Sequence, residues 1–292
     1  MRTLLASLLV TLSAAGSAAA QTAPEAVLPL EQYRKGVAAR IIVAGKPRLF
    51  TFDTGGGVTI ISPALAKELG CAPFGSIVGY RMTGDKLAMP RCDSVHIDWN
   101  RTALVAPMAG VFDVTPLAAA DAQPLDGLLA LDVFAGKTIT LDMAGLKLTV
   151  ETAASAAERT RDAVELPAHL AREIGGRALA VYVDVPSAKG ALSFELDSAN
   201  GGTILISKPY AQLLGLDPER GPQPGAFPVA PGVEAKGLMF TPELTIDGNL
   251  GVPFMKNWVI TMDLAHGRVW LKRASVPPPP GMGVPPPLPA AK

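Results

Sequence analysis

The sequence predicts an all-β protein built from two similar lobes, and three observations lead to this expectation. The 292 residues include 29 Gly and 27 Pro but only 5% aromatic residues, a composition that favours short strands joined by turns. Hydrophobic residues make up 49% of the chain and charged residues 18%, so a large core can be buried. Segments near both ends of the first half recur in the second half, and such a repeat indicates two equivalent lobes.

The first repeated segment carries an aspartate at the end of an apolar strand. Residues 52–59 read FDTGGGVT and residues 196–203 read LDSANGGT, so Asp53 and Asp197 are separated by 197 − 53 = 144 residues. A short helix with Ser at its start, Pro in its first turn and Gly at its end is expected after each one. A lone carboxylate is rarely buried at such a position, so we expect each Asp to be the partner of the other.

The second repeated segment predicts a β-hairpin near the end of each lobe. Residues 138–148 and 259–271 alternate apolar and polar side chains and contain a Gly-bearing turn. The segments before them, residues 126–134 and 247–255, match at an offset of 247 − 126 = 121 residues. The helices expected after the two aspartates, at 62–70 and 207–215, match at an offset of 145 residues because one residue is inserted before the second helix. The offset falls to 121 residues at the end of each half, so the middle of the first half is 145 − 121 = 24 residues longer than the middle of the second.

These repeats divide the chain into lobes and flanking segments. We expect a signal peptide at 1–20, an N-terminal extension at 21–36, a first lobe at 37–152, a helical or flexible linker at 153–163, a second lobe at 164–273 and a Pro-rich disordered tail at 274–292. The tail is expected to be a spacer, and a ligand for a partner protein is the alternative.

The N-terminus has the features of an export signal. Arg2 precedes an apolar run, and Ala18 and Ala20 occupy the small-residue cleavage positions. We therefore expect a periplasmic or secreted protein with no integral membrane segment after signal cleavage. An uncleaved anchor is the alternative, which is disfavoured because the apolar run is too short to span a bilayer.

Charge and residue spacing exclude several classes of function. Lys+Arg and Asp+Glu are both 26, so no basic surface points to nucleic acid. His96, His169 and His266 lack the spacing of metal ligands, so we expect neither a metal nor a cofactor. The Gly-rich residues 55–57 are not followed by the Lys and Ser/Thr of a phosphate-binding loop. Asp142 and Asp263 are expected to cap turns rather than to act in catalysis.

The two cysteines favour a disulfide. Cys71 and Cys92 both lie in the first half, and an exported protein can oxidise them. Closing a loop of roughly 20 residues would stabilise the fold by about 3 kcal/mol. Two separate thiols are the alternative.

The paired aspartates imply a specific chemistry if their turns face each other. Two adjacent buried carboxyls cannot both ionise, so they share a proton and titrate as a coupled pair. Such a pair can deprotonate a water that attacks an amide carbonyl and can protonate the developing oxyanion. The hydroxyls of Thr54 and Ser198 are expected to hold the two turns in register. Gly55 permits a tight turn, and Ala199 is tolerated if its φ is negative.

On these motifs the chain resembles the pepsin/retropepsin superfamily of aspartic proteases, in an exported single-chain form of bacterial style with two retropepsin-like lobes. Residues 53–55 (DTG) match the family motif, and residues 197–199 (DSA) are a less usual variant. The family's second element resembles residues 128–130 and 249–251. The resemblance implies a two-lobed acid-protease β-barrel fold with a cleft between pseudo-symmetric lobes. It also implies an aspartic endopeptidase that cleaves peptide or protein substrates with Asp53 and Asp197, as a monomer and without a cofactor.

Three positions depart from the family pattern. Ala130 replaces a Gly, Asn249 replaces an apolar residue, and Asn200 follows Ala199. A small displacement of the second turn could lower activity greatly. The alternative expectation is therefore a weak or inactive protein of the same fold that binds peptides or a protein partner.

The resemblance also implies a hairpin flap that covers the cleft. The best candidate is residues 78–86, in which Gly79 and Gly84 flank the turn and Tyr80 could lean over the aspartates. In the second lobe, residues 226–239 offer a turn at 231–232. For each hairpin, a surface position without a catalytic role is the alternative.

Overall fold

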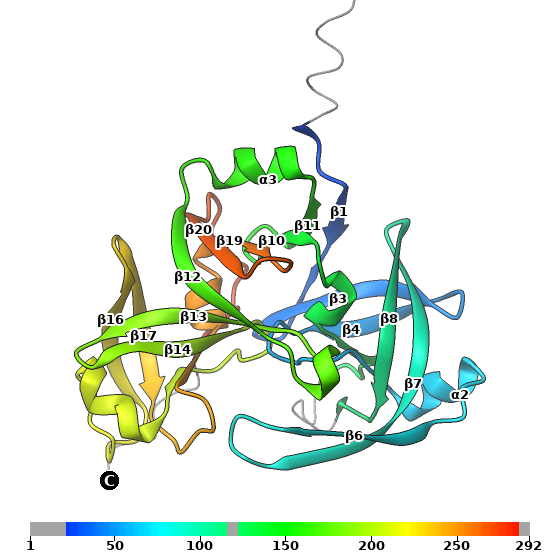
Figure 1. Ribbon diagram of the computed structural model, residues 1–292, viewed down its shortest axis with the longest axis horizontal. Helices are drawn as coiled ribbons and strands as arrows, with labels where there is room; N and C mark the ends of the chain where they lie inside the picture. Colours follow the sequence, from blue (N-terminus) through cyan, green and yellow to red (C-terminus); the bar gives the residue numbers. More distant parts are fainter. Residues whose placement is uncertain (1–21, 116–121, 286–292) are drawn as a thin grey trace, which may run out of the picture.

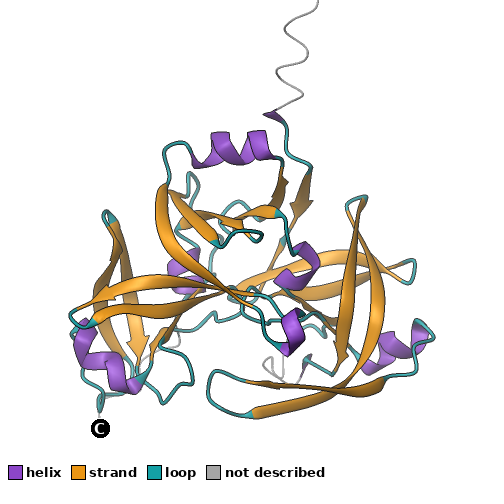
Figure 2. Cartoon of the chain, viewed as in Figure 1, coloured by secondary structure: helices purple, strands orange, loops and turns teal. Residues whose placement is uncertain are grey.

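The structure, a computed structural model, describes residues 22–115 and 122–285 (Figure 1). Strands form about half of the described chain, and the helices are short and lie at the ends of strands (Figure 2). The all-β, two-lobed acid-protease fold that the sequence predicts is confirmed. The expected signal peptide at 1–20 lies outside the described residues, as does the end of the tail.

A six-stranded layer joins the two lobes and forms part of the larger sheet. Its order is β1 (Ala26–Pro29), β11 (Lys147–Glu151), β10 (Thr138–Asp142), β19 (Trp258–Asp263), β20 (Arg268–Arg273) and β12 (Val164–Ala171). The expected hairpins at 138–148 and 259–271 are confirmed as β10–β11 and β19–β20. They pair through β10 and β19, where Thr140 faces Thr261 and their Oγ1 atoms lie 3.0 Å apart. These two residues are equivalent in the repeat, so the pseudo-two-fold axis passes between them.

The first lobe is a separate eight-stranded sheet within the described residues. Its order is β2 (Glu31–Tyr33), β3 (Gly36–Val43), β4 (Lys46–Phe52), β9 (Gly127–Leu129), β5 (Ile60–Ile61), β8 (Thr102–Val111), β7 (Lys86–Trp99) and β6 (Phe74–Tyr80). Phe52, Trp99 and Phe134 meet in its core with ring centroids 6.4 to 6.5 Å apart. Burying three large rings supplies much of this core's hydrophobic stabilisation.

The second lobe repeats this plan with six strands instead of eight. Its order is β13 (Ala180–Ser187), β14 (Gly190–Asp197), β18 (Gly248–Gly251), β15 (Ile204–Ile206), β17 (Val233–Phe240) and β16 (Gln223–Ala230). Strand β4 beside β9 corresponds to β14 beside β18, and both pairs are parallel. No strand of this lobe corresponds to β6 within the described residues, and the flap hairpin β6–β7 falls in the segment where the first half is 24 residues longer.

The helices begin where the sequence predicts, although one differs in type. In α2 (Pro63–Glu68) the Ser62 hydroxyl accepts a hydrogen bond from the Leu65 N–H at 3.1 Å. The equivalent η4 (Lys208–Leu214) is a 3₁₀-helix, and the Ser207 hydroxyl instead bonds the Leu244 carbonyl at 3.3 Å. Between the lobes, α3 (Ala153–Thr160) gives the expected linker a helical structure, and Thr152 caps it. The remaining short helices are η2 (Leu131–Phe134), η3 (Ile174–Gly176) and α4 (Val252–Met255).

The expected N-terminal extension and the described part of the tail both contribute to the fold. Strands β1 and β2 lie within the expected N-terminal extension, where β1 is an edge strand of the shared layer. The tail was expected to be disordered from residue 274, and this is wrong for the part that the structure describes. Met282 is 1% exposed, the Lys256 ammonium donates to its carbonyl at 2.8 Å, and the Gly283 N–H donates to the Lys35 carbonyl at 2.8 Å.

Candidate active site

The two predicted aspartates occupy equivalent positions at the ends of β4 and β14. Asp53 follows Phe52 and Asp197 follows Leu196, and each turn lies beside a parallel strand of its own lobe. Both residues are largely buried, with 9% and 6% of their surface exposed. The two carboxyls are neighbours on either side of Gly55, whose N–H donates to Asp53 Oδ1 at 2.9 Å and on which a Cβ would lie 3.2 Å from the Asp197 Cγ. The structure therefore brings together the two residues that the repeat predicts.

Reciprocal hydrogen bonds lock the two turns together. The Thr54 N–H donates to Ser198 Oγ at 3.0 Å, and the Ser198 N–H donates to Thr54 Oγ1 at 3.0 Å. Each hydroxyl then donates to a carbonyl of the opposite lobe, Thr54 to Leu196 at 2.6 Å and Ser198 to Phe52 at 2.8 Å. Both side chains are fully buried. The N–H and hydroxyl groups of both residues are therefore satisfied, which holds the two turns at a fixed separation.

Burial and mutual repulsion keep a proton in the pair. Burial raises the pKa of the Asp53 carboxyl well above its ordinary value, and the neighbouring Asp197 carboxyl raises that pKa further. Hydrogen bonds from the Gly55 and Gly56 N–H groups oppose the shift only in part. The pair thus retains one shared proton over a wide pH range, which is the state that acid–base catalysis with a water needs.

The small residues of the turns are required by the space around them. A Cβ on Gly55 would lie 3.2 Å from the Asp197 Cγ and 3.1 Å from the Glu195 Cδ, so only glycine fits without a shift. Ala199 does not have a positive φ, so its side chain causes no backbone strain. A Cβ on Gly251 would collide with the backbone oxygen of Asn200 and would lie 2.7 Å from its side-chain nitrogen, so glycine is needed there as well.

A polar network beside Asp197 was not expected from the sequence. Glu195 accepts hydrogen bonds from the Tyr182 hydroxyl at 3.2 Å and from the Asn249 amide at 3.2 Å. The same amide donates to Asp197 Oδ2 at 2.9 Å. Burial, then Asp197 and then Asp53, raise the pKa of the Glu195 carboxyl well above its ordinary value. Residues two apart on a strand share a face, so the alternation in β14 could have revealed Glu195.

The first lobe has a different buried carboxyl below its turn. Asp132 accepts hydrogen bonds from the Thr59 hydroxyl at 2.7 Å and from the Thr59 N–H at 3.1 Å. Burial raises its pKa to about 6, although the bonds from Thr59 lower it. Asp132 therefore anchors the strand that follows the Asp53 turn.

The β6–β7 hairpin lies where residues 78–86 predict the candidate flap, although Tyr80 does not lie over the aspartates. Gly79 pairs with Leu87, the Gly84 N–H closes the turn on the Arg81 carbonyl at 2.8 Å, and Tyr80 is 67% exposed. The alternation of the strand points Tyr80 away from the protein, because buried Ile77 lies on the opposite face. The turn reaches the second lobe, where Met82 bonds Thr245 (Figure 1). The second-lobe hairpin at 226–239 is confirmed as β16–β17.

An apolar cluster lies between the flap and the first-lobe turn. It includes side chains from the flap hairpin, from the strand after Asp53 and from the second lobe. Its buried members are Ala38, Leu49, Val58, Ile60, Ile77, Met89, Met108, Val114, Leu125 and Ala178. The β-bridge between Gly57 and Leu179 closes one end of this region. These buried side chains pack the β6–β7 hairpin against the rest of the first lobe.

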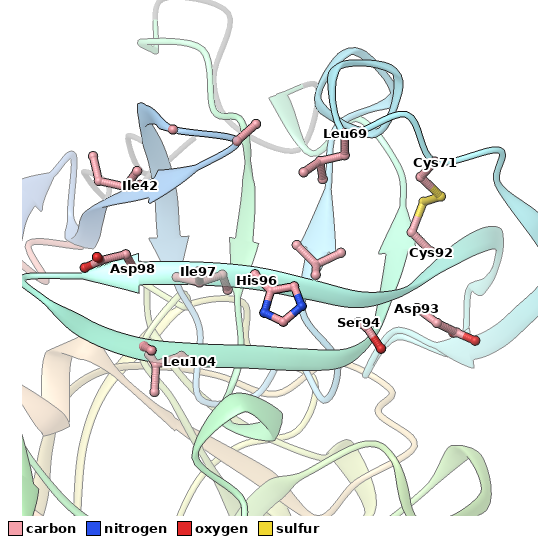
Figure 3. A pocket seen from close by; sticks show the side chains of 14 residues that line it. Ile42, Leu69, Cys71, Cys92, Asp93, Ser94, His96, Ile97, Asp98 and Leu104 are labelled. Carbon is pink, nitrogen blue, oxygen red and sulfur yellow. A yellow bond between two sulfur atoms is a disulfide. The ribbon is translucent and has the colours of Figure 1, made fainter.

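The other predicted residues lie away from the aspartates. Cys71 and Cys92 form a disulfide that joins the end of α2 to β7, and it lines a cavity of about 580 Å³ on the first lobe (Figure 3). His96 lies in the same cavity, whereas His169 and His266 each bond an aspartate on the second lobe. Asp142 and Asp263 cap turns as expected, each through backbone N–H groups.

Within residues 22–115 and 122–285, no helix is long and apolar enough to cross a membrane. No group of three or more His, Cys, Asp or Glu residues in that part of the chain is arranged to hold a metal ion.

Comparisons with known proteins support the fold. No family model matches the sequence, and no curated protein matches it. Among solved structures, the basic 7S globulin from soybean is similar with a TM-score of 0.54 and 10% identity, over 86% of this chain and 95% of that chain. Conglutin gamma, a basic 7S globulin from lupine seeds, is similar with a TM-score of 0.53 and 9% identity, over the same shares. Both likenesses concern the two-lobed aspartic-protease-like fold, and both proteins are named as globulins.

Proposed function

We propose that this chain is an exported aspartic endopeptidase that binds an extended peptide between its lobes. The observation that carries the proposal is the close approach of the Asp53 and Asp197 carboxyls beside Gly55, held by the reciprocal bonds of Thr54 and Ser198. A structural role alone would not require two buried carboxyls to face each other, because their mutual repulsion is costly.

The pair can hydrolyse an amide when it holds one proton. The ionised carboxylate takes a proton from water as the water oxygen bonds the carbonyl carbon, and the protonated carboxyl gives its proton to the carbonyl oxygen. The resulting diol collapses when the first carboxyl protonates the amide nitrogen and the C–N bond breaks. A proton of the diol returns to the second carboxyl, which restores the starting state. The β6–β7 hairpin would cover a peptide bound between the lobes and exclude water.

A second candidate is a protein of this fold that binds a peptide without cleaving it. The observation that favours it is the asymmetry of the turns, because Asn200, Asn249 and Glu195 surround Asp197 with polar contacts. The solved structures of similar fold are named as globulins, so the fold alone does not imply peptidase activity.

Cleavage of an unfolded protein substrate distinguishes the two candidates. The mature chain is incubated with the substrate from acidic to neutral pH, beside Asp53→Asn and Asp197→Asn variants. We expect cleavage by the wild type that a statine-type transition-state analogue inhibits and that both variants lose. Binding without cleavage by the wild type would favour the second candidate. Full activity in either variant would refute the shared mechanism.

Export is the part of the proposal that rests on residues 1–20 alone. Sequencing the N-terminus of the protein recovered from the periplasm or the medium tests it. We expect the mature chain to begin at Gln21.

A further inference from the structure

Backbone groups fix the orientation of the Asn200 amide in the second-lobe turn. The Gly202 N–H donates to Asn200 Oδ1 at 3.2 Å, and Asn200 Nδ2 donates to the Thr203 carbonyl at 2.9 Å. A backbone N–H can only donate and a carbonyl can only accept, so the amide cannot be reversed. Asn200 Nδ2 also donates to Asn249 Oδ1 at 2.8 Å.

The orientation of Asn249 follows from that of Asn200. Its oxygen accepts from Asn200, so its amide nitrogen must face the carboxyls. This nitrogen donates to Asp197 Oδ2 at 2.9 Å and to Glu195 Oε2 at 3.2 Å. Both N–H groups of a fully buried amide are thus used, and Asn249 is a fixed donor to Asp197.

The two aspartates therefore have different numbers of donors. Asp197 accepts from the Ala199 N–H at 2.8 Å and the Asn200 N–H at 3.0 Å, and Asn249 adds a third bond. Asp53 accepts from the Gly55 N–H at 2.9 Å. Leu128, which pairs beside β4 as Asn249 pairs beside β14, has no donor to offer. Each donor stabilises the ionised form, so the charge is favoured on Asp197.

Glu195 does not compete for that charge. The groups that face it are the Tyr182 hydroxyl, the Asn249 amide and the carboxyls of Asp197 and Asp53, none of which is positive. A buried carboxyl in such surroundings holds its proton. Glu195 thus remains neutral and anchors Asn249 next to Asp197.

We propose that Asn249 is a positioning residue that gives the aspartates different roles: Asp197 carries the charge and acts as the general base, and Asp53 holds the proton and acts as the general acid. The roles rest on the proposed peptidase function, whereas the location of the proton is a property of the resting protein. In the first step Asp197 takes the proton of water and Asp53 gives its proton to the carbonyl oxygen. Both carboxyls return to their starting states after the C–N bond breaks.

Carbon-13 NMR of protein labelled at the aspartate carboxyls locates the proton without any substrate. Asp53→Asn and Asp197→Asn variants assign the two resonances, and spectra are recorded where the pair holds one proton. We expect Asp53 to be protonated in preference to Asp197 by about tenfold or more, because a hydrogen bond to a charged group is a strong one.

Exchanging Leu128 and Asn249, which are equivalent in the repeat, tests whether Asn249 causes the proton to prefer Asp53. We expect Asn249→Leu to lower the preference by about tenfold, and we expect the Leu128→Asn/Asn249→Leu double variant to reverse it. Asn257→Leu, which removes an asparagine that bonds only backbone carbonyls of α4, is the control and should leave the preference unchanged. Leu128→Asn alone keeps Asn249 in place, so it provides a test even if Asn249→Leu does not fold, and we expect it to lower the preference.

The outcomes separate this inference from the proposed function. A proton located on Asp197 in the wild type, or a preference that neither Asn249→Leu nor Leu128→Asn changes, overturns the inference. A chain that cleaves no peptide but shows the expected proton distribution overturns the proposed function and supports the role of Asn249.

Discussion

The carbonyl oxygen of Met82, at the tip of the flap, accepts two hydrogen bonds from Thr245 of the opposite lobe. The backbone N–H of Thr245 donates at 2.8 Å and its hydroxyl at 3.2 Å. The flap is therefore tied to the second lobe as well as to the first. Under the proposed function, a peptide that enters beneath the flap would have to break this contact.

Removing the hydroxyl bond is expected to make the flap open more often. Thr245→Ala retains the backbone bond and loses a hydrogen bond that contributes about 0.5–1.5 kcal/mol. We expect amide hydrogen exchange at residues 81–85 to accelerate by roughly twofold to tenfold, measured by mass spectrometry. Ser187→Ala is the control, because it removes a similar bond in the β13–β14 turn. Unchanged exchange at the flap would show that Met82 and Thr245 do not restrain it.

The flap shows what a sequence can and cannot predict. The hairpin follows from a local pattern, since residues 78–86 combine strand formers with a Thr-Gly-Asp turn. The bond to Thr245 joins residues 163 positions apart, and no local pattern encodes it. The outward direction of Tyr80 depends on which face of β6 is buried, and that is decided by Ile77 and its partners.

The site was predictable to the extent that it repeats. Asp53 and Asp197 stand in matching motifs, and Thr54 and Ser198 follow them directly. The network around Glu195 has no counterpart in the first lobe, where Thr51 and Leu128 occupy the equivalent positions. Its residues come from β13, β14 and β18, which only the folded sheet brings together. The docking of the tail could not be predicted either. Its proline content suggests disorder, whereas the burial of Met282 depends on a surface formed by both lobes.

Replacing Thr54 with Val is expected to destabilise the fold and to disturb the aspartates. The variant leaves the Ser198 N–H and the Leu196 carbonyl without their partner, at a cost of about 1–3 kcal/mol for each buried group. Urea denaturation measures the free energy of unfolding, and cleavage assays measure activity. Thr140→Val removes a buried hydroxyl at the pseudo-two-fold axis and is the control. We expect both variants to lose stability but only Thr54→Val to lose activity, and equal activities would contradict this role.

The raised pKa of Glu195 predicts a pH dependence of stability. Its folded-state pKa lies above its unfolded value, so between these values the folded protein binds more protons than the unfolded chain. The stabilisation that Glu195 contributes is therefore fully present at pH values below its pKa in the unfolded chain. It is lost as the pH rises through its pKa in the folded protein. Glu195→Gln keeps the shape and does not ionise. We expect its stability relative to wild type to increase as the pH is raised from acidic to neutral.

Urea denaturation at a series of pH values measures this effect. The matched control is Glu234→Gln, which changes an exposed glutamate on β17. We expect the difference between Glu195→Gln and wild type to grow with pH and that of the control to stay constant. A constant difference for both variants would mean that Glu195 is ionised in the folded protein.

Removing the docked tail is expected to destabilise both lobes together. Residues 280–283 bond Gln32 and Lys35 of the first lobe and Lys256 of the second, and Met282 is buried. Burial lowers the pKa of the Lys256 ammonium, so its stable burial depends on the carbonyls of Met282 and Gly283. A chain that ends at residue 275 loses these partners and the methionine, and we expect it to lose about 2–5 kcal/mol of unfolding free energy.

The matched control ends at residue 285 and keeps every one of these contacts. Thermal unfolding of the two chains tests the prediction, because equal midpoints would show that the tail contributes nothing to the fold.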